Sequence, residues 1–235
     1  MDILLKSIFV GLPKTVGNKE AADLMDREWT SAIFKEPVQG PIFVGKTKIN
    51  GDCQGDLEHH GGPEKAVLGY SLDNYTYWQG ELGYTQIIPG GMGENFSMAN
   101  IDEESIAIGD TFQIGETVVQ VSQPRQPCWK PARRFKIKNL ALLMQNTGKT
   151  GWYFRVLQEG VVEEGQTFTL VDRLYPQWTI SKCNQILHGK EQNFAEMREL
   201  AHCELLAPGM RDTLEKRVEK GEAPDIRSRV FGPNE

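Results

Sequence analysis

Long apolar runs, a basic leader and paired cysteines are all missing from this 235-residue sequence. No stretch approaches the roughly 18 apolar residues that a membrane-spanning helix needs, so no membrane segment is predicted. The opening "MDILLKSIFVGLPKTVG" has no basic residues ahead of its apolar stretch, and we interpret it as a first strand, not a signal peptide. The four cysteines form no CxxC pair. Reduced thiols and a cytoplasmic location are therefore expected.

Several cofactor motifs are also missing. HExxH, GxxxxGK[ST], and GxGxxG between a strand and a helix do not occur, so zinc-protease, P-loop and dinucleotide sites are not expected. The formal net charge of −6 argues against broad nucleic-acid binding. Residues 181–235 carry nine Lys or Arg against ten Asp or Glu. This balance also disfavours the alternative of a DNA-reading helical module at the C-terminal end.

The residues that are present divide the chain into two parts. Twenty of the 24 glycines lie in residues 1–180. Between them run short β-branched or aromatic stretches, which predict strands joined by turns, as in a β-barrel or sandwich. The clearest are "IFVGL", "PIFVGKTKI", "TFQIGETVVQVSQ" and "GQTFTLV". Two helices are expected within this part, at "LDNYTYWQGEL" and "KNLALLMQN".

Beyond residue 180 the apolar residues recur at helical spacing. Pro208 and Gly209 separate two such stretches, and Gly189 is placed to end a third, "SKCNQILHG". We predict a mainly β domain with helices over residues 1–180, followed by a small all-α three-helix domain over 181–235. The residues expected to be buried in these helices are Met197, Leu200, Leu214 and Val218.

One basic segment surrounds a cysteine. "SQPRQPCWKPARRFKIK", residues 122–138, contains six Lys or Arg, no Asp or Glu, and Cys128. Its prolines at 124, 127 and 131 predict a rigid extended loop in place of a helix or central strand. Nearby cations stabilise a thiolate, which is a nucleophile or a soft-metal ligand. The alternative is a solvated basic loop with an incidental cysteine.

A second candidate is the Gly-rich loop "GDCQGDLEHHGGPEKAV", residues 51–67. Adjacent residues such as His59 and His60 rarely reach one ion together, and no third ligand stands at a zinc-site spacing. A histidine that acts as an acid, a hydrogen-bond donor or a loop anchor is the preferred interpretation.

Two further glycine-containing turns are candidates for binding an anion through backbone N–H groups. "PGGMGENFS" covers residues 89–97, and "MQNTGKTGWYF" covers residues 144–154. A plain hairpin turn is the alternative for the first stretch. A glycine that ends a helix is the preferred interpretation of the second.

Taken together and in this order, these stretches resemble the MOSC domain, named for the C-terminal domain of molybdenum cofactor sulfurase, and its YiiM-type subgroup. The matching elements are "SAIFKEPV" (31–38), "GDCQGDLEHHGGPEKAV", "GENFS" (93–97), "VSQPRQPC" (121–128) and "NTGKTGW" (146–152). The resemblance spans nearly the whole chain. It implies a β-barrel-like fold with surrounding helices, followed by a three-helix domain.

The resemblance also implies a cofactor and a reaction. Relatives bind a pterin-based molybdenum cofactor (Mo-molybdopterin) and reduce N-hydroxylated compounds, such as hydroxylamino-purines and amidoximes, by two-electron cleavage of the N–O bond. Cys128 would be the metal ligand and a catalytic residue, and His60 is a candidate proton donor. A separate reductase would supply the electrons. The residues implied to bind the cofactor are Ser31, Lys35, His59, Gly93, Glu94, Asn95, Arg125, Asn146, Thr147, Gly148 and Trp152.

This interpretation explains why the segment is basic, because its cations would bind an anionic cofactor. Arg125 is the first candidate for that contact, while Arg133, Arg134 and Lys136 are candidates for simple solvation. Three alternatives stay open: a cofactor carrier without turnover, a metal-free enzyme that uses Cys128 and His60, and a helical interaction module with an inert barrel. The natural substrate, the electron donor, the proton source and the choice between monomer and homodimer are left open.

Overall fold

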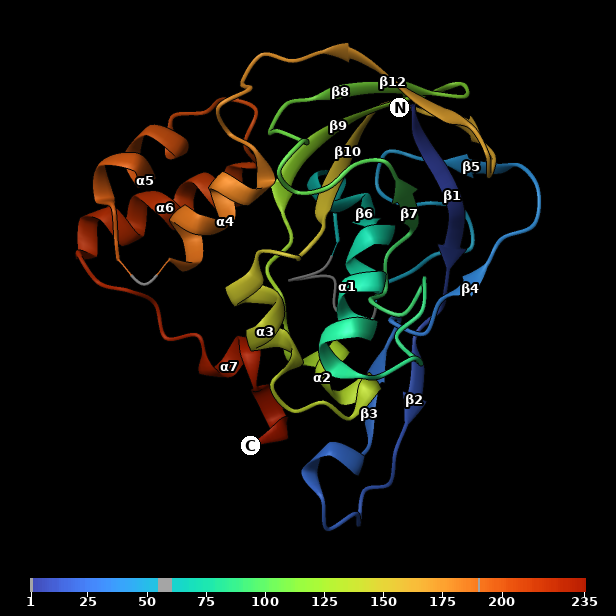
Figure 1. The fold of residues 1–235 in the computed structure, drawn as a ribbon, viewed down its shortest axis with the longest axis vertical. Helices are drawn as coiled ribbons and strands as arrows, with labels where there is room; N and C mark the ends of the chain where they lie inside the picture. Colours follow the sequence, from blue (N-terminus) through green and yellow to red (C-terminus); the bar gives the residue numbers. More distant parts are fainter. Residues whose placement is uncertain (1, 55–60, 190) are drawn as a thin grey trace.

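The centre of the molecule is a closed β-barrel, seen in a computed structural model that describes residues 2–54, 61–189 and 191–235 (Figure 1). The strand order is β12-β8-β9-β10-β6-β7-β1, and pairing of β1 with β12 closes the ring. All of these pairs are antiparallel except β6 with β7. The barrel strands are β1 (Ile3–Val10), β6 (Val67–Ser71), β7 (Phe96–Ala99), β8 (Thr111–Ile114), β9 (Thr117–Pro124), β10 (Trp152–Gln158) and β12 (Thr167–Asp172).

The expected strands form because their apolar residues can fill the barrel. Edge-to-face rings pack inside it, with centroids 5.9 Å apart for Phe112 and Phe168 and 6.0 Å apart for Phe96 and Phe168. Burying one such ring stabilises the fold by about 1.5–3 kcal/mol. Gly115 takes a φ of 52° at the turn between β8 and β9, the left-handed conformation that a two-residue hairpin favours. The mainly β part of the fold prediction is therefore confirmed.

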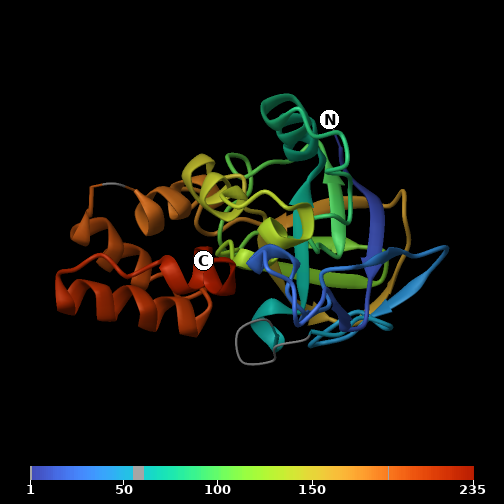
Figure 2. The same ribbon diagram turned by 90° about the horizontal axis from the view of Figure 1, so that it is seen from below.

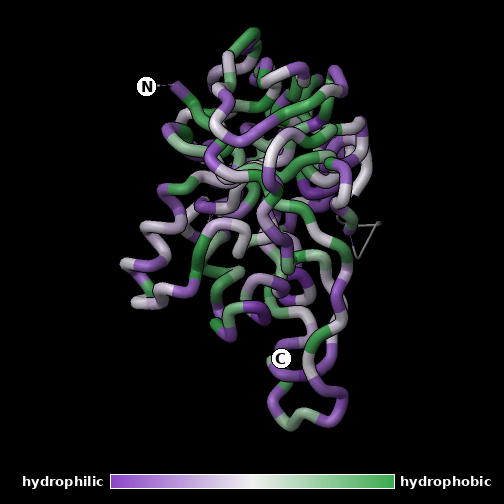
Figure 3. The backbone as a smooth tube through the Cα atoms, turned by 90° about the vertical axis from the view of Figure 1, so that its right-hand side faces the viewer, coloured by the Kyte–Doolittle hydropathy of each residue, from purple (hydrophilic) through white to green (hydrophobic). Residues whose placement is uncertain are grey.

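Short strands and helices surround the barrel. β2 (Lys14–Val16) pairs with β3 (Trp29–Ser31) in an arm that projects beyond it, and Figure 3 shows that this arm is largely hydrophilic. β4 (Glu36–Pro37) pairs with β1, and β5 (Ile42–Val44) pairs with β11 (Gly160–Val162). The helices of this part are α1 (Leu72–Leu82), α2 (Trp129–Phe135) and α3 (Leu140–Thr147), with 3₁₀ turns η1 (Leu24–Asp26) and η2 (Pro63–Lys65).

Helices α1 and α3 match the predicted stretches, and together with α2 they cover a second apolar cluster outside the barrel. Trp78 is fully buried in this cluster, and its indole nitrogen donates a 2.8 Å hydrogen bond to the hydroxyl of Tyr70. Gly83 ends α1 and Gly148 ends α3, both with left-handed backbone.

The last helices stand as a group beside the barrel (Figures 1 and 2). They are α4 (Ile180–His188), α5 (Phe194–Ala201) and α6 (Pro208–Lys220), and the short α7 (Arg227–Val230) and η3 (Gly232–Asn234) follow. α4, α5 and α6 confirm the predicted helices, with Pro208 at the start of α6. Met197, Leu200 and Leu214 are buried as expected, whereas Val218 is only half-buried.

The apolar core of these helices is continuous with the barrel core. Ile180, Cys183 and Leu214 belong to the same cluster of buried side chains as Leu5 and Val121. The domain boundary at residue 180 stays a prediction. In the described part of the chain, no helix combines the length and the apolar character needed to cross a membrane.

His188 gives this helical group a pH dependence. Burial, with the neighbouring Arg229 and Arg217, lowers the pKa of His188 to about 3, against about 6.5 in an unfolded chain. Between these values the unfolded state binds a proton that the folded state does not. The free energy of unfolding should therefore fall as the pH drops below about 6.5, with a limiting slope of about 1.4 kcal/mol per pH unit from this residue.

His188→Asn should remove this contribution. Urea unfolding followed at several pH values between about 4 and 7 should show a flatter decline in the variant than in the wild type. Parallel curves would show that His188 does not titrate as described.

Candidate functional site

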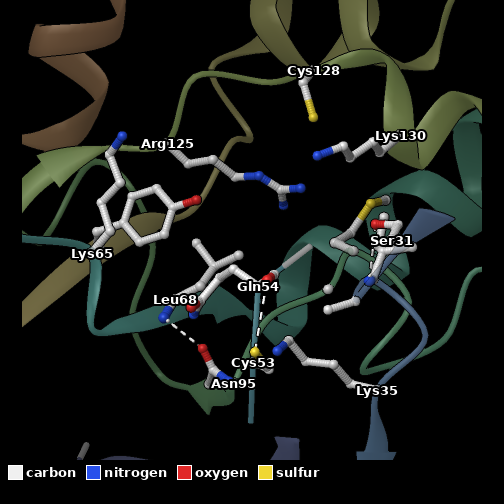
Figure 4. Close-up of a pocket in the computed structure, with 15 residues that line it drawn as sticks. Ser31, Lys35, Cys53, Gln54, Lys65, Leu68, Asn95, Arg125, Cys128 and Lys130 are labelled. Atoms are coloured by element: carbon white, nitrogen blue, oxygen red, sulfur yellow. Dashed lines mark hydrogen bonds between the residues drawn. The ribbon is translucent and has the colours of Figure 1, made fainter. Parts of the chain in front are cut away.

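A cavity lies at the barrel wall, where loops from distant parts of the sequence meet (Figure 4). Four cations line it, and none of its described lining residues is acidic. The loop of residues 51–63 contributes Cys53 and Gln54 from its described part, the "GENFS" turn contributes Gly93 and Asn95, and the basic segment contributes Cys128. These three loops thus converge as predicted. The cations are Lys35, Lys65, Arg125 and Lys130.

Cys128 stands between a strand and a helix. β9 runs to Pro124, and Cys128 is the N-cap of α2, which includes Pro131 in its first turn. The predicted extended loop therefore covers only residues 125–128, and the prediction that the prolines exclude a helix was wrong for Trp129–Phe135. Pro131 is tolerated because a residue in the first turn has no intrahelical partner for its N–H group. Cys128 is 8 % exposed, and its sulfur points into the cavity in Figure 4.

Arg125 is the strongest electrostatic feature of the cavity. Its side chain is 6 % exposed, and its guanidinium extends into the cavity below Cys128 (Figure 4). The buried Nη1 atom has no hydrogen-bond partner among the described residues. Burying a charged group without a partner is costly. This position is therefore suited to an anionic ligand that completes the hydrogen bonding of Arg125.

Lys35 is held at the opposite side of the cavity by a buried acid. The carboxylate of Asp52 accepts hydrogen bonds from Lys35, from the backbone N–H of Gly11 at 2.9 Å and from the side-chain amide of Asn95 at 2.9 Å. The Lys35 and Asp52 side chains are only 6 % and 0 % exposed. Burial lowers the pKa of Lys35, and Asp52 opposes that shift. Lys35 is therefore a fixed donor at the wall of the cavity.

The "GENFS" turn forms one wall of the cavity, and contacts of its own residues fix its conformation. Gly93 has a φ of 82°, and a Cβ there would lie 2.8 Å from the side chain of Ile33, so this position requires glycine. Asn95 accepts a hydrogen bond from the backbone N–H of Leu68 at 3.0 Å. Ser31, also among the predicted residues, lines the cavity from the end of β3.

Glu94 has a different position from that predicted. It is fully buried, is absent from the cavity lining, and its Oε1 accepts hydrogen bonds from Tyr75 at 2.5 Å, Gly90 at 2.6 Å and Ser97 at 2.7 Å. Glu94 therefore stabilises the turn that presents Gly93 and Asn95.

The second predicted turn does not reach the cavity. Thr147 donates to the carbonyl of Leu143 at 2.8 Å, and Gly148 ends α3, as the structural interpretation of this stretch expected. Trp152 is fully buried in the barrel core and packs against Phe154 with centroids 6.4 Å apart. The geometry gives no support to a cofactor contact by Asn146, Thr147, Gly148 or Trp152. His59 and His60 lie outside the described residues.

Three other cations of the basic segment, Arg133, Arg134 and Lys136, contact residues outside the cavity. The expectation that Arg133 and Arg134 are solvated was wrong. Arg133 lies 5.2 Å from the ring centroid of Trp129, and Arg134 donates to the carbonyl of Gly90 at 3.1 Å. Lys136 is exposed, yet it pairs with Asp26 at 2.5 Å. These contacts tie α2 to its surroundings and leave Arg125 and Lys130 at the cavity.

Nine described lining residues of the cavity were not among the predicted site residues, and three of these carry an ammonium or phenol group: Lys65, Lys130 and Tyr153. Lys65 and Lys130 both lie inside quoted motifs, and positive charge beside the matched elements was the available signal. Tyr153 directly follows the "NTGKTGW" motif on β10, whose alternation turns its side chain away from the buried Trp152. Burial raises the pKa of Tyr153. Its phenol therefore keeps its proton near neutral pH and is a donor at the cavity wall.

The C-terminal end of the chain holds the Cys128 segment in place, which the sequence did not indicate. Arg229 on α7 donates to the carbonyl of Pro127, next to Cys128, and to the side-chain oxygen of Gln145 at 2.6 Å. Asn234 donates to the carbonyl of Trp129 at 3.3 Å. Both ends of the turn that carries Cys128 are thus bonded to residues about a hundred positions further along the chain.

The fold and the cavity together define a closed barrel followed by a helical unit. The cation-lined site of the barrel holds a thiol and an arginine whose Nη1 has no hydrogen-bond partner among the described residues. Comparison with known families agrees. Residues 56–169 match the MOSC domain, and residues 178–221 match the YiiM-like, 3-alpha helix domain. The chain belongs to the MOSC family, with a YiiM-like three-helix domain at its C-terminal side.

Several known proteins are similar in sequence to most of this chain. The uncharacterized protein YflK of Bacillus subtilis is 34% identical over 89% of this chain and 94% of its own. Protein YiiM of Escherichia coli is 33% identical over 86% of this chain and 91% of its own. The crystal structure of YiiM from Geobacillus stearothermophilus is 35% identical, with a TM-score of 0.76 over 92% of this chain and 99% of that one. A Gibberella moniliformis protein named "Reductase" is 35% identical over 75% of this chain, but this covers only 31% of its length.

Arg229→Gln tests the support of the Cys128 segment. Losing two charge-assisted hydrogen bonds should destabilise the closed position of the segment by about 1.5 kcal/mol or more. Opening to solvent should then become roughly tenfold more frequent. Alkylation of Cys128, followed by peptide mass spectrometry, should accelerate accordingly.

Arg227→Gln is the matched control, because Arg227 lies on the same helix, is exposed and pairs only with Glu235 among the described residues. Equal alkylation rates in the Arg229 variant and the control would contradict the proposed support.

Proposed function

We propose that this chain binds a molybdenum–pterin cofactor and reduces N-hydroxylated compounds by two-electron cleavage of their N–O bond. One observation carries the proposal: the buried Arg125 guanidinium lies in the same cavity as the thiol of Cys128, and its Nη1 has no hydrogen-bond partner in the part of the chain that the structure describes. A strong anion site beside a soft sulfur ligand fits a group that has both an anionic phosphate and a thiophilic metal.

The described residues fit such a group. Cys128 would be the metal ligand, and a thiolate is a suitable donor for a metal held mainly by sulfur. Arg125 has the planar fork that matches phosphate, and Lys35, Lys65 and Lys130 add positive charge around it. When bound, the molybdenum centre supplies the two-electron chemistry of the reaction.

The chain itself has to bind the substrate, orient it and supply protons. Reduction of R–NHOH to R–NH₂ and water consumes two electrons and two protons as the N–O bond breaks. Tyr153 lines the cavity, and burial raises the pKa of its phenol, so its hydroxyl can orient a substrate as a hydrogen-bond donor but is a weaker proton source than an ordinary tyrosine. The predicted proton donor His60 lies outside the described residues. We assign the electrons to a separate reductase partner.

Two further observations support the proposal without testing its details. The Gibberella moniliformis relative named "Reductase" matches this chain over part of its length, in agreement with a redox reaction. All four cysteines are free of disulfides, which agrees with the reducing cytoplasm in which we place the protein.

Four single Cys→Ser variants test the assignment of the metal ligand. Cys128→Ser replaces a soft sulfur by a hard, mostly protonated hydroxyl, so molybdenum content and reduction of a hydroxylamino-purine should fall to near background. Cys183→Ser and Cys203→Ser change packing residues outside the cavity and should keep both. Cys53→Ser, at the wall of the same cavity, should also keep both. Each variant is made in a host that synthesises the cofactor, and its folding is checked by circular dichroism.

A second pair of variants tests whether Arg125 binds the cofactor specifically or only adds to the general positive charge of the segment. Arg125→Ala should lower cofactor retention far more than Lys138→Ala, because Lys138 is exposed and outside the cavity. Cys128→Ser with wild-type molybdenum content and rate would contradict the ligand assignment. Molybdenum without any turnover would indicate a carrier, and turnover without molybdenum would indicate a metal-free enzyme.

A further inference from the structure

Asp52 is a buried acid that joins three segments of the chain around the cavity. Its side chain is 0 % exposed and is absent from the cavity lining. Its Oδ1 atom accepts hydrogen bonds from Lys35 and from the backbone N–H of Gly11 at 2.9 Å, and its Oδ2 atom accepts one from the side-chain amide of Asn95 at 2.9 Å. Lys35 and Asn95 both line the cavity. Asp52 therefore fixes two cavity residues from outside the cavity.

The contacts of Asp52 leave its carboxylate little freedom to move. Asn95 is itself held, because its side-chain amide also donates to the carbonyl of Phe9 at 3.1 Å. The backbone N–H of Cys53, the next residue after Asp52, donates to the carbonyl of Gly11 at 3.0 Å. The backbone on either side of this contact is thus anchored to the end of β1. The carboxylate has a fixed position from which it acts on its partners.

The charge of Lys35 depends on this acid. The Lys35 side chain is only 6 % exposed. Burial lowers the pKa of its ammonium group, and the charge and hydrogen bond of Asp52 are the strongest opposing effects. Glu94 and Cys53 oppose the shift less. Without the negative charge of Asp52, burial would therefore favour the neutral amine over the ammonium group.

Lys35 differs in this respect from Arg125, the other cation discussed above. A guanidinium stays charged in proteins, whereas a buried lysine readily loses its proton. A neutral amine no longer attracts an anion. Lys35 can therefore contribute charge to the cavity only while its amine is protonated. The other titratable residues of the described lining are Cys53, Lys65, Cys128, Lys130 and Tyr153.

We propose that Asp52 is a positioning residue for anion binding, because it holds the ammonium group of Lys35 as a cation at the wall of the cavity. This role needs the negative charge of Asp52, whereas a purely structural role would need only its hydrogen bonds. The identity of the anion rests on the proposed function, in which the cofactor has an anionic phosphate. Asp52 thereby sets the pH range over which the cavity binds that anion at full strength.

Asp52→Asn separates the two roles. The variant loses the charge and keeps the size of the side chain, with an oxygen that can still accept hydrogen bonds from Lys35 and Gly11. The probe is sulfate, whose charge stays constant over the range studied. Its affinity for the full chain, made in a host without cofactor synthesis, is measured by calorimetry at constant ionic strength between about pH 6 and 10, where a buried lysine titrates.

Sulfate affinity should be full where Lys35 is protonated and should fall as the pH rises through the pKa of Lys35. Because removal of the neighbouring negative charge lowers that pKa, the fall should be centred at a lower pH in Asp52→Asn than in the wild type. Lys35→Gln should bind sulfate more weakly at the low end of the range. Its remaining pH dependence comes from the other groups and is subtracted from the other curves.

Two further variants are the controls. Asp110→Asn is the matched control, because Asp110 is also fully buried, pairs with Arg173 at 2.6 Å and accepts a backbone N–H bond from Ala107 at 2.8 Å, yet lies outside the cavity lining. Its curve should match that of the wild type. Lys35→Arg, alone or combined with Asp52→Asn, should remove the fall assigned to residue 35, because arginine stays protonated.

Three results would overturn the inference. An equal midpoint in Asp52→Asn and the wild type, with affinity lowered uniformly, would show that Asp52 is only structural. Wild-type sulfate binding in Lys35→Gln would show that Lys35 does not act on the anion. If Asp52→Asn does not fold, the single Lys35→Arg variant decides, because a fall unchanged from the wild type would show that residue 35 does not titrate.

Failure of the proposed function gives a different result, because none of these measurements uses molybdenum. The molybdenum content of the wild type is determined separately, on protein from a host that synthesises the cofactor. A wild type that shows the described sulfate curves but takes up no molybdenum would contradict the proposed function and leave the role of Asp52 intact. Normal molybdenum uptake with equal midpoints would contradict the role of Asp52 alone.

Discussion

The site depends on a positive charge that the protein buries without giving it a partner. Arg125 directly follows the last residue of β9, and its Nη1 atom is buried without a hydrogen bond among the described residues. Nearby acids are committed elsewhere: Asp52 binds Lys35, Gly11 and Asn95, and Glu94 binds Tyr75, Gly90 and Ser97. A folded chain can maintain such a charge when an anionic ligand compensates it. Binding of an anionic ligand at Arg125 would therefore be linked to the arrangement of the surrounding loops.

The rest of the molecule keeps this charge beside a thiol. The closed barrel fixes the end of β9, α2 fixes the far side of Cys128, and the C-terminal residues bond to the carbonyls of Pro127 and Trp129. The helical group therefore does more than add stability. Its helices α6 and α7 form one wall of a second cavity that also reaches Cys128, and Arg229 holds the segment that lines both cavities.

Much of the fold followed from local patterns in the sequence. Apolar periodicity located α1, α3, α4, α5 and α6, because each buries one face and ends at a recognisable residue such as Gly83, Gly148 or Gly189. α2 was missed because proline was taken to exclude a helix, although its first turn tolerates proline. α7 was missed because four residues with no apolar repeat give no periodic signal.

The site was predicted less completely than the fold. The motif resemblance correctly selected several residues that line one cavity, namely Ser31, Lys35, Asn95, Arg125 and Cys128. It could not distinguish cavity-lining residues from Glu94, which supports the turn, or from Trp152, which fills the barrel. The direction in which a side chain points depends on tertiary packing. The contacts of Arg229 join residues about a hundred positions apart and have no local signature.

Molybdenum K-edge X-ray absorption on protein from a cofactor-producing host tests the central claim most directly. We predict a molybdenum signal with one protein-derived sulfur ligand in addition to the sulfur ligands of the cofactor. That ligand should disappear in Cys128→Ser and persist in Cys53→Ser, whose sulfur lines the same cavity. An identical sulfur shell in wild type and Cys128→Ser would contradict the account.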